Sequence, residues 1–269
     1  MGADAMRLMK ANQAPSSFMD KAMREVCDAA TAKGVRLLPS AEETNTLAAY
    51  HSWTLNMQRR YNTATNGMVI YNTYQAYLRS CAETVTEHLN DAKKHGYTLG
   101  VKLVRGAYLG SEPQGTIFGS KEDSDASYDW IASSLIKQEY TGVSEDFPQV
   151  DVVLATHNAV SVRKAQALRT QQLLAKEKTI PLVYAQLQGM ADEVSCELIQ
   201  AGKANGVDGH VVDVPKAFKL TTWGSMTQCL NYLLRRAAEN KDAAGRTMES
   251  KAAMAGELRR RFKLLFGSA

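Results

Sequence analysis

The sequence has few cysteines, and their placement excludes several classes of protein. Four occur in 269 residues, far apart and without a Cys-x-x-Cys pair: Cys27, Cys81, Cys196 and Cys229. This spacing is typical neither of a disulfide framework nor of a zinc site. We therefore predict free thiols in a reducing compartment and no metal site.

The chain also lacks long apolar runs and a marked excess of either charge. No run approaches the roughly 20 apolar residues of a membrane span. Residues 1–30 show no secretory signal, and Asp4, Asp20 and Glu25 argue against a transit peptide. The net charge of +4, with no basic run interleaved with aromatics, argues against nucleic-acid binding. Because repeats, low-complexity segments and linkers are missing as well, we predict a single domain over residues 1–269.

What the chain does have is a regular alternation of short β-like runs and long helical ones. The expected strands are residues 35–38, 68–72, 99–104, 152–155, 182–186 and 218–222. The expected helices are residues 16–33, 41–61, 74–95, 160–176, 192–201, 225–240 and 247–266, with a loop at 110–121. Such alternation predicts a parallel α/β sheet with helical crossovers. Six strands suit a doubly wound sheet and are two fewer than a barrel of eight, yet no Gly-x-Gly-x-x-Gly or phosphate loop follows any strand.

Polar and small residues follow the expected strands, where parallel α/β folds bind their ligands. Lys102 alternates with apolar neighbours inside a strand and needs a partner or a ligand there. After the same strand, Gly106 and Ala107 would let backbone N–H groups approach a ligand closely. The other candidates at strand ends are Gln75, Arg105, Thr156 and His157. Each has an ordinary structural alternative, such as a lysine that snorkels outward; together they predict a pocket with cationic and amide groups.

Two adjacent arginines lie near the C-terminal end of the chain, on a helical stretch. Arg235 and Arg236 share it with leucines that give an apolar face, and Glu239 follows one turn later, close enough to orient an arginine. Guanidinium groups bind carboxylates in a bidentate fork, so one interpretation is a clamp for a small carboxylate. The alternative is a helix end with basic residues and a surface ion pair.

Five motifs carry a resemblance to a known family. They are NTYQAYL at 72–78, KLVRGAY at 102–108, ATHN at 155–158, QLQGM at 186–190 and YLLRRAAEN at 232–240, and they span about residues 34–241. In residue type, order and spacing the chain resembles the proline dehydrogenases (proline oxidases), especially the fungal members. The resemblance implies a distorted (β/α)8 TIM-like barrel with FAD at the C-terminal strand ends. Here we expect that barrel to be incomplete, with about six β/α units and an extra C-terminal helix.

The resemblance also implies a reaction and a location. The family oxidises L-proline to 1-pyrroline-5-carboxylate, the first step of proline catabolism, by moving a hydride from C5 to the flavin N5. Electrons then pass to a membrane quinone. Eukaryotic members are mitochondrial and lie at the inner membrane, so the mitochondrion, with a peripheral membrane contact, is the expected location; the alternative is the cytoplasm.

Roles for individual residues follow only from this resemblance. Arg235 and Arg236 would bind the proline carboxylate, braced by Glu239. Tyr232 and Leu187 would line the substrate pocket. The positions that match cofactor contacts are Ala41, Gln75, Arg105, Gly106, Ala107, Thr156 and His157, while Lys102 and Ser40 match positions that act on the reacting centre. A cation such as Lys102 near the flavin would stabilise its reduced anionic form.

The chain departs from the family pattern at three places. Ser40 stands where the family has an aspartate, and Leu220 where it has a tyrosine near the substrate. The first two family strands are expected before Gly2, so the open sheet edges would need cover from the N-terminal helix or from another copy in a homo-oligomer. Two alternatives therefore stay open: a divergent or truncated member that has lost flavin oxidation and binds proline-like amino acids or serves another biosynthetic step, and a non-catalytic scaffold.

Overall fold

The structure is a computed structural model that describes residues 2–40, 42–204, 213–239 and 247–265. Its centre is a parallel sheet of five strands in the order β1-β2-β3-β4-β5. The strands are β1 (Asn72–Gln75), β2 (Leu99–Val104), β3 (Val150–Ala155), β4 (Leu182–Leu187) and β5 (Lys216–Leu220). Spatial order follows chain order, so each crossover joins neighbouring strands, as the alternating sequence predicts.

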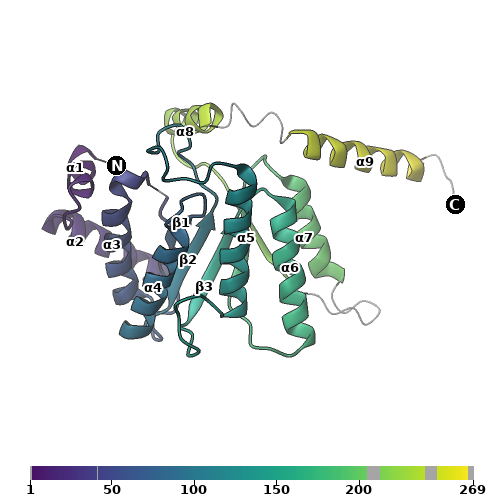
Figure 1. Cartoon of the computed structure of the whole chain (residues 1–269). Helices are drawn as coiled ribbons and strands as arrows, with labels where there is room; N and C mark the ends of the chain where they lie inside the picture. The colour runs from purple at the N-terminus through teal and green to yellow at the C-terminus, as the bar shows by residue number, and fades with distance from the viewer. Residues whose placement is uncertain (1, 41, 205–212, 240–246, 266–269) are drawn as a thin grey trace.

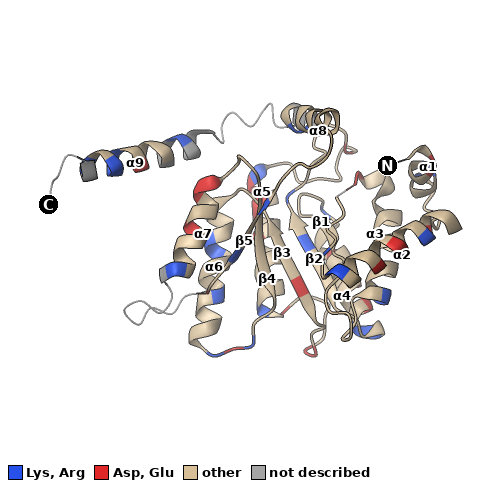
Figure 2. Cartoon of the chain, turned by 180° about the vertical axis from the view of Figure 1, so that it is seen from behind, with Lys and Arg blue, Asp and Glu red and all other residues tan. Residues whose placement is uncertain are grey.

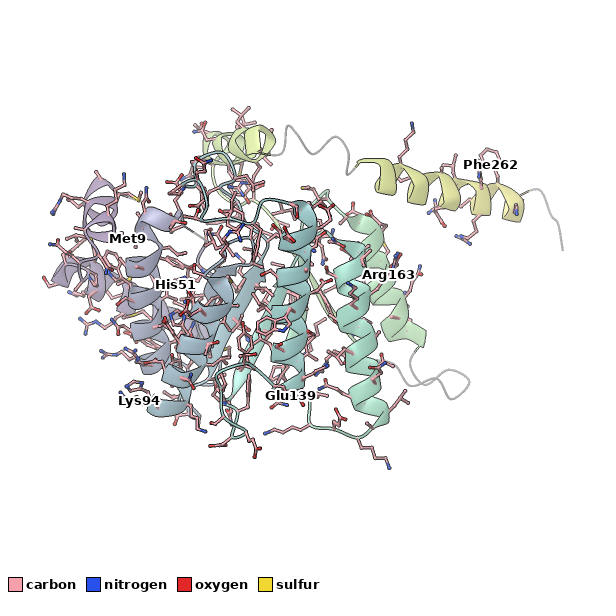
Figure 3. All side chains as sticks on the ribbon, viewed as in Figure 1. Met9, His51, Lys94, Glu139, Arg163 and Phe262 are labelled. Atoms are coloured by element: carbon pink, nitrogen blue, oxygen red, sulfur yellow. The ribbon has the colours of Figure 1, made fainter. Side chains whose placement is uncertain are left out.

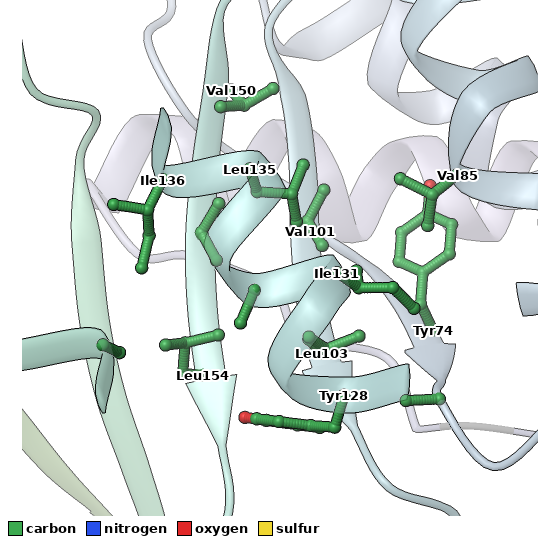
Figure 4. Packing of buried hydrophobic residues seen from close by; sticks show 14 of the residues in the cluster. Tyr74, Val85, Val101, Leu103, Tyr128, Ile131, Leu135, Ile136, Val150 and Leu154 are labelled. Carbon is green, nitrogen blue, oxygen red and sulfur yellow. The ribbon is translucent and has the colours of Figure 1, made fainter. Parts of the chain in front are cut away.

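Helices cover one face of this sheet (Figure 1). The crossover helices are α4 (Cys81–His95), α5 (Lys121–Lys137), α6 (Ala159–Leu174) and α7 (Asp192–Ala204). Val101, Leu103 and Leu154 alternate along their strands and pack beneath Ile131 and Leu135 of α5 (Figure 4). These buried aliphatic side chains form the main core between sheet and helices.

The opposite face of the sheet, seen in Figure 2, is called here the helix-free face. Because successive strand residues point to opposite faces, the register assigns to it one row that crosses all five strands. The row consists of Thr73, Lys102, Val153, Val183 and Lys216. A lysine in the middle of a buried strand therefore points away from the helical core.

Three helices precede the sheet: α1 (Ala3–Lys10), α2 (Ser17–Lys33) and α3 (Thr44–Tyr61). Ser16 caps α2 by accepting a hydrogen bond from the Met19 N–H at 3.3 Å, and Gly34 ends the helix with φ at 62°. The prediction of a helix from 16 to 33 is thus confirmed. Tyr50, Trp53 and neighbouring residues of α3 pack against α1 and α2 in a smaller core.

Two helices follow the sheet: α8 (Met226–Glu239) and α9 (Thr247–Leu265). In Figure 1, α8 lies across the end of the sheet at which the strands finish, whereas α9 extends away from the body. Leu230, Leu233 and Leu234 of α8 are exposed, by 50%, 50% and 67%. The apolar face of α8 is therefore turned outward among the described residues. Among these residues, no helix combines the length and the hydropathy needed to cross a bilayer.

The expectation of six strands is wrong by one within the described part of the chain. Residues 35–38 form a single parallel bridge, Leu37 to Ile70, instead of a strand. Pro39 lacks the N–H that would extend the pairing, and its carbonyl accepts from the Thr73 hydroxyl at 2.6 Å instead. Regular pairing begins later than the strand expected at 68–72, because β1 is Asn72–Gln75. Its last two residues lie in the segment expected to be helical, and the helix expected from 74 begins at Cys81.

Candidate active site

The predicted site residues gather at the end of the sheet where the strands finish. Gln75 ends β1, Arg105 follows β2, Thr156 follows β3 and Leu187 ends β4. Since parallel strands present their carboxyl ends at one edge, segments far apart in sequence lie close together there. Helix α8 passes over the same end (Figure 1).

Lys102, on the helix-free face of β2, lies near a second cation, Arg236 of α8. Burial and the nearby guanidinium of Arg236 both lower the pKa of Lys102, with burial the larger cause. Arg236 also lies over the ring of Tyr232, 5.6 Å from its centroid. Within the described residues, Lys102 has neither an ion pair nor a hydrogen bond to an acceptor. Two positive groups in a partly dehydrated setting favour an anion between or beside them.

Ser40 follows Pro39, which is hydrogen-bonded to the strand that pairs with the strand of Lys102. The Pro39 carbonyl is held by the Thr73 hydroxyl at 2.6 Å and by the Tyr50 hydroxyl at 3.4 Å. Thr73 is the register partner of Lys102. Ser40 is exposed and directly follows Pro39, which is held by Thr73 of the row that contains Lys102. The serine side chain carries no charge that could balance the lysine. Ala41, a predicted cofactor contact, lies outside the described residues.

Gln75 joins two loops at the strand ends. Its side-chain amide donates to the Glu42 carbonyl at 2.9 Å, and its amide oxygen accepts from the Ala107 N–H at 3.2 Å. A Cβ on Gly106 would lie 2.4 Å from ring atoms of Tyr77. The glycine thus permits close packing of the backbone on a buried tyrosine ring, a reason that the sequence does not reveal.

Arg105 is the centre of a polar network between the ends of β2, β3 and two helices. Its Nε donates to Asp125 at 2.5 Å, one terminal nitrogen to Thr156 at 2.5 Å and the other to Ser161 at 2.8 Å. The guanidinium lies 4.4 Å from the ring centroid of Tyr128. All three of its nitrogens bind protein atoms, so the network holds the arginine rigidly at the rim of the candidate site.

His157 is also held in a defined orientation. Its Nε2 accepts a hydrogen bond from the Leu187 N–H at 3.0 Å. A neutral imidazole that accepts at Nε2 carries its proton on Nδ1. The predicted residues Thr156, His157 and Leu187 are therefore brought together by adjoining strands β3 and β4.

The predicted carboxylate clamp is only partly described. Arg235 and Glu239 lie on α8, but their side chains fall outside the described residues, so the bracing of Arg235 stays a prediction. Tyr232 and Arg236 are half-buried on the side of α8 opposite its exposed leucines. The arginine that is described thus lies near Lys102, as a site that binds an anion requires.

Several residues of the site were missed by sequence reasoning. Asp125 and Ser161 hold Arg105, and Glu112 accepts hydrogen bonds from Tyr77 and from the start of α3. These partners are 20 to 68 residues apart in sequence, and no local pattern marks them. Among the described residues there is no group of three or more metal-ligating side chains.

A scan against family models matches the proline dehydrogenase model over residues 3–249. The chain belongs to the proline dehydrogenase family. A probable mitochondrial proline dehydrogenase of Schizosaccharomyces pombe is 29% identical over 88% of this chain and 49% of its own length. A hydroxyproline dehydrogenase of Bos taurus is 32% identical over 89% of this chain and 50% of its own length. The chain therefore spans about half the length of these relatives.

Solved structures agree on the fold of this proline dehydrogenase family member. Proline utilization A from Bradyrhizobium japonicum superposes with a TM-score of 0.65 and 21% identity, covering 88% of this chain and 22% of that one. At this identity the likeness concerns the fold alone: an α/β fold whose five parallel strands match part of that structure. The family's FAD dependence makes flavin chemistry the first function to consider for the cation pair.

Proposed function

We propose that the chain catalyses the FAD-dependent oxidation of L-proline to 1-pyrroline-5-carboxylate. The observation that carries the proposal is the proximity of Lys102, within β2, to Arg236 of α8. A buried lysine beside a guanidinium suits a bound carboxylate and the negative charge that a reduced flavin develops. Family membership supplies the reaction type, and this electrostatic setting is compatible with it.

The residues present fit an FAD group by their chemistry. Lys102 has no described acceptor on a half-buried face, which suits an anionic partner. Gln75 and the Ala107 backbone lie at the adjacent strand end, beside Thr156 and His157. When bound there, FAD would accept the hydride from C5 of the substrate. We assign Gln75, Arg105, Gly106, Ala107, Thr156, His157 and Ala41 to the cofactor surroundings.

The chain's own groups would bind and orient the substrate. Arg235 and Arg236 would hold the carboxylate, Glu239 would brace them, and Tyr232 and Leu187 would pack on the ring. Lys102 would stabilise the charge that develops during hydride transfer, and Ser40 would border the same space. Hydride transfer needs positioning more than acid–base chemistry, and this set of groups is suited to positioning.

The test is dye reduction by the purified chain after loading with FAD, on addition of L-proline. Lys102→Met preserves length but removes the charge, and we expect it to lower kcat/KM by roughly 10- to 100-fold, the range for a lost charge-assisted hydrogen bond. Lys94→Met is the matched control, because Lys94 is exposed near the C-terminal end of α4, at the end of the molecule opposite α8 (Figure 3). FAD-loaded, folded protein that stays silent to proline would refute the proposal.

Two features favour a second candidate, a divergent member that binds proline-like amino acids without oxidising them. Ser40 supplies no negative charge beside Lys102, and Leu220 of β5 is 54% exposed where the family pattern has a tyrosine. Calorimetry that shows proline binding in the absence of flavin, together with no turnover, would support this candidate. Hydroxyproline is a further substrate to test, since a relative of similar identity is a hydroxyproline dehydrogenase.

We further propose the surroundings in which the reaction would run. Relatives carry the description mitochondrial, so the proposed location is the mitochondrion, with a quinone as electron acceptor at a peripheral membrane contact. Residues 1–269 would act as one domain. A homo-oligomer that covers the edges of the sheet is proposed as the assembly, and sedimentation of the purified chain tests it.

A further inference from the structure

Two loops that frame the candidate site are fastened to each other by one carboxylate. Glu112 lies in the loop between β2 and α5, which begins with Arg105. One of its oxygens accepts from the Thr44 backbone N–H at 3.2 Å, and the other from the Tyr77 hydroxyl at 2.8 Å. Nearby, the Ser111 hydroxyl donates to Glu43 at 2.5 Å. The loop after β2 is thus tied to the segment that leads from Ser40 into α3.

The contact at Thr44 supplies what the local sequence does not. Glu43 is the N-cap of α3, yet its side chain makes no capping hydrogen bond. The first N–H groups of a helix need acceptors from outside the helix, and a negative charge is favourable there. Glu112 meets both needs from 68 residues away. Its position is therefore fixed by the helix terminus.

The contact at Tyr77 reaches the backbone assigned to the cofactor. The ring of Tyr77 is buried and packs directly on Gly106. A Cβ added to Gly106 would lie only 2.4 Å from the ring atoms. The Tyr77 N–H also donates to the Arg105 carbonyl at 2.8 Å. Any displacement of the ring would therefore move the backbone of Gly106 and Ala107. The hydroxyl bond to Glu112 restrains that displacement.

We propose that Glu112 is a positioning residue: through Tyr77 it orders the Gly106–Ala107 backbone, and through Thr44 it sets the distance of that backbone from the Ser40 segment. The inference rests on the proposed function, because it assigns this backbone to FAD. Glu112 itself touches neither cofactor nor substrate. Its contribution is preorganisation, which lowers the ordering cost that the ligand must otherwise supply.

The first test measures the Kd for FAD by quenching of flavin fluorescence. Glu112→Ala and Tyr77→Phe should each raise the Kd about tenfold, the effect of one lost charge-assisted hydrogen bond. The double variant should show no further loss, because both changes remove one link. Glu112→Gln keeps an acceptor for Thr44 and a partner for Tyr77 and should restore most of the affinity. Glu139→Ala, at the opposite end of the molecule (Figure 3), is the control.

An unchanged Kd in Glu112→Ala, or strictly additive effects in the double variant, would overturn the assignment. The second test needs no flavin and therefore separates this inference from the proposed function. Hydrogen exchange in Glu112→Ala should accelerate in residues 105–108 as well as at the start of α3. Acceleration confined to the helix start would make Glu112 a cap alone. If wild-type protein fails to bind FAD, the proposed function is refuted. The hydrogen-exchange measurement then decides by itself whether Glu112 orders the loop.

Discussion

A buried pair of histidines makes acid unfolding the sharpest stability prediction for this chain. His51 of α3 and His88 of α4 are only 7% and 8% exposed, with ring centroids 5.2 Å apart. The Tyr74 hydroxyl bonds the His88 Nδ1 at 2.8 Å, and Asn72 bonds the His51 Nδ1 at 2.9 Å. Both rings thus lie in a closed polar cluster among helices and β1, where a charge is poorly solvated.

The structure gives the magnitude and the sign. Burial lowers the pKa of His51 from 6.5 to about 4 and that of His88 from 6.5 to about 3, and in His88 the nearby His51 adds to the effect. Below pH 6.5 the two histidines bind protons in the unfolded chain but stay neutral in the folded chain. The free energy of unfolding therefore falls as pH falls. Each histidine contributes a slope of about 1.4 kcal/mol per pH unit. By pH 4, the neutral state of buried His51 alone lowers the free energy of unfolding by about 3 kcal/mol. This is a large part of a typical domain stability of roughly 5–15 kcal/mol.

The assay is urea unfolding at a series of pH values from 7 to about 4.5, a window in which most carboxylates stay ionised. His51→Gln and His88→Gln should each remove about half of the slope, and the double variant nearly all of it. His95→Gln, on the exposed surface of α4, is the control. We expect it to retain most of the slope of the unfolding free energy against pH. A wild-type slope near zero between pH 6.5 and 5 would refute the buried-neutral assignment.

Three further predictions follow from single contacts. Gly106→Ala should destabilise the fold by about 1–3 kcal/mol through overpacking on Tyr77, measured by denaturant unfolding; an unchanged midpoint would contradict the close approach. Asp151→Ala should cost about 2–3 kcal/mol, because Tyr71 and Arg36 lose their shared acceptor; a loss under 0.5 kcal/mol would show that the cluster is dispensable. We expect a carboxylate introduced by Ser40→Asp to raise the pKa of Lys102, so that FAD-loaded protein retains its activity to higher pH; an unshifted pH profile would count against the proposal that Ser40 borders the space of Lys102.

Local sequence signals predicted many of the elements. Ser16 and Gly34 bound α2 as capping rules require, and the alternation of strands and helices predicted parallel pairing. Helix α5 was missed, although Ser120 caps it by accepting from the Asp123 N–H. Its buried Tyr128, Ile131 and Leu135 are spaced by three and four residues, but the segment also carries many polar residues, so its amphipathic pattern is weak.

Other features depend on contacts that no local pattern encodes. The strand expected at 35–38 does not form because Pro39 ends its pairing. A tertiary hydrogen bond from the Thr73 hydroxyl to the Pro39 carbonyl holds the segment instead. The outward apolar face of α8 could not be predicted, because periodicity shows that a helix has an apolar side without saying what that side meets. The family motifs named candidate site residues, whose roles stay predictions, and the partners of Arg105 and Gly106 became evident only in three dimensions.

The central claim is that Lys102 and Arg236 mark a site for FAD and the carboxylate of L-proline. The most direct measurement is the visible spectrum of FAD-reconstituted protein under anaerobic conditions, before and after addition of L-proline. We predict that the protein retains the flavin through gel filtration and that L-proline bleaches its visible absorbance, with much weaker bleaching in Lys102→Met. A folded protein that retains no flavin, or whose bound flavin stays oxidised at saturating L-proline, would contradict the account.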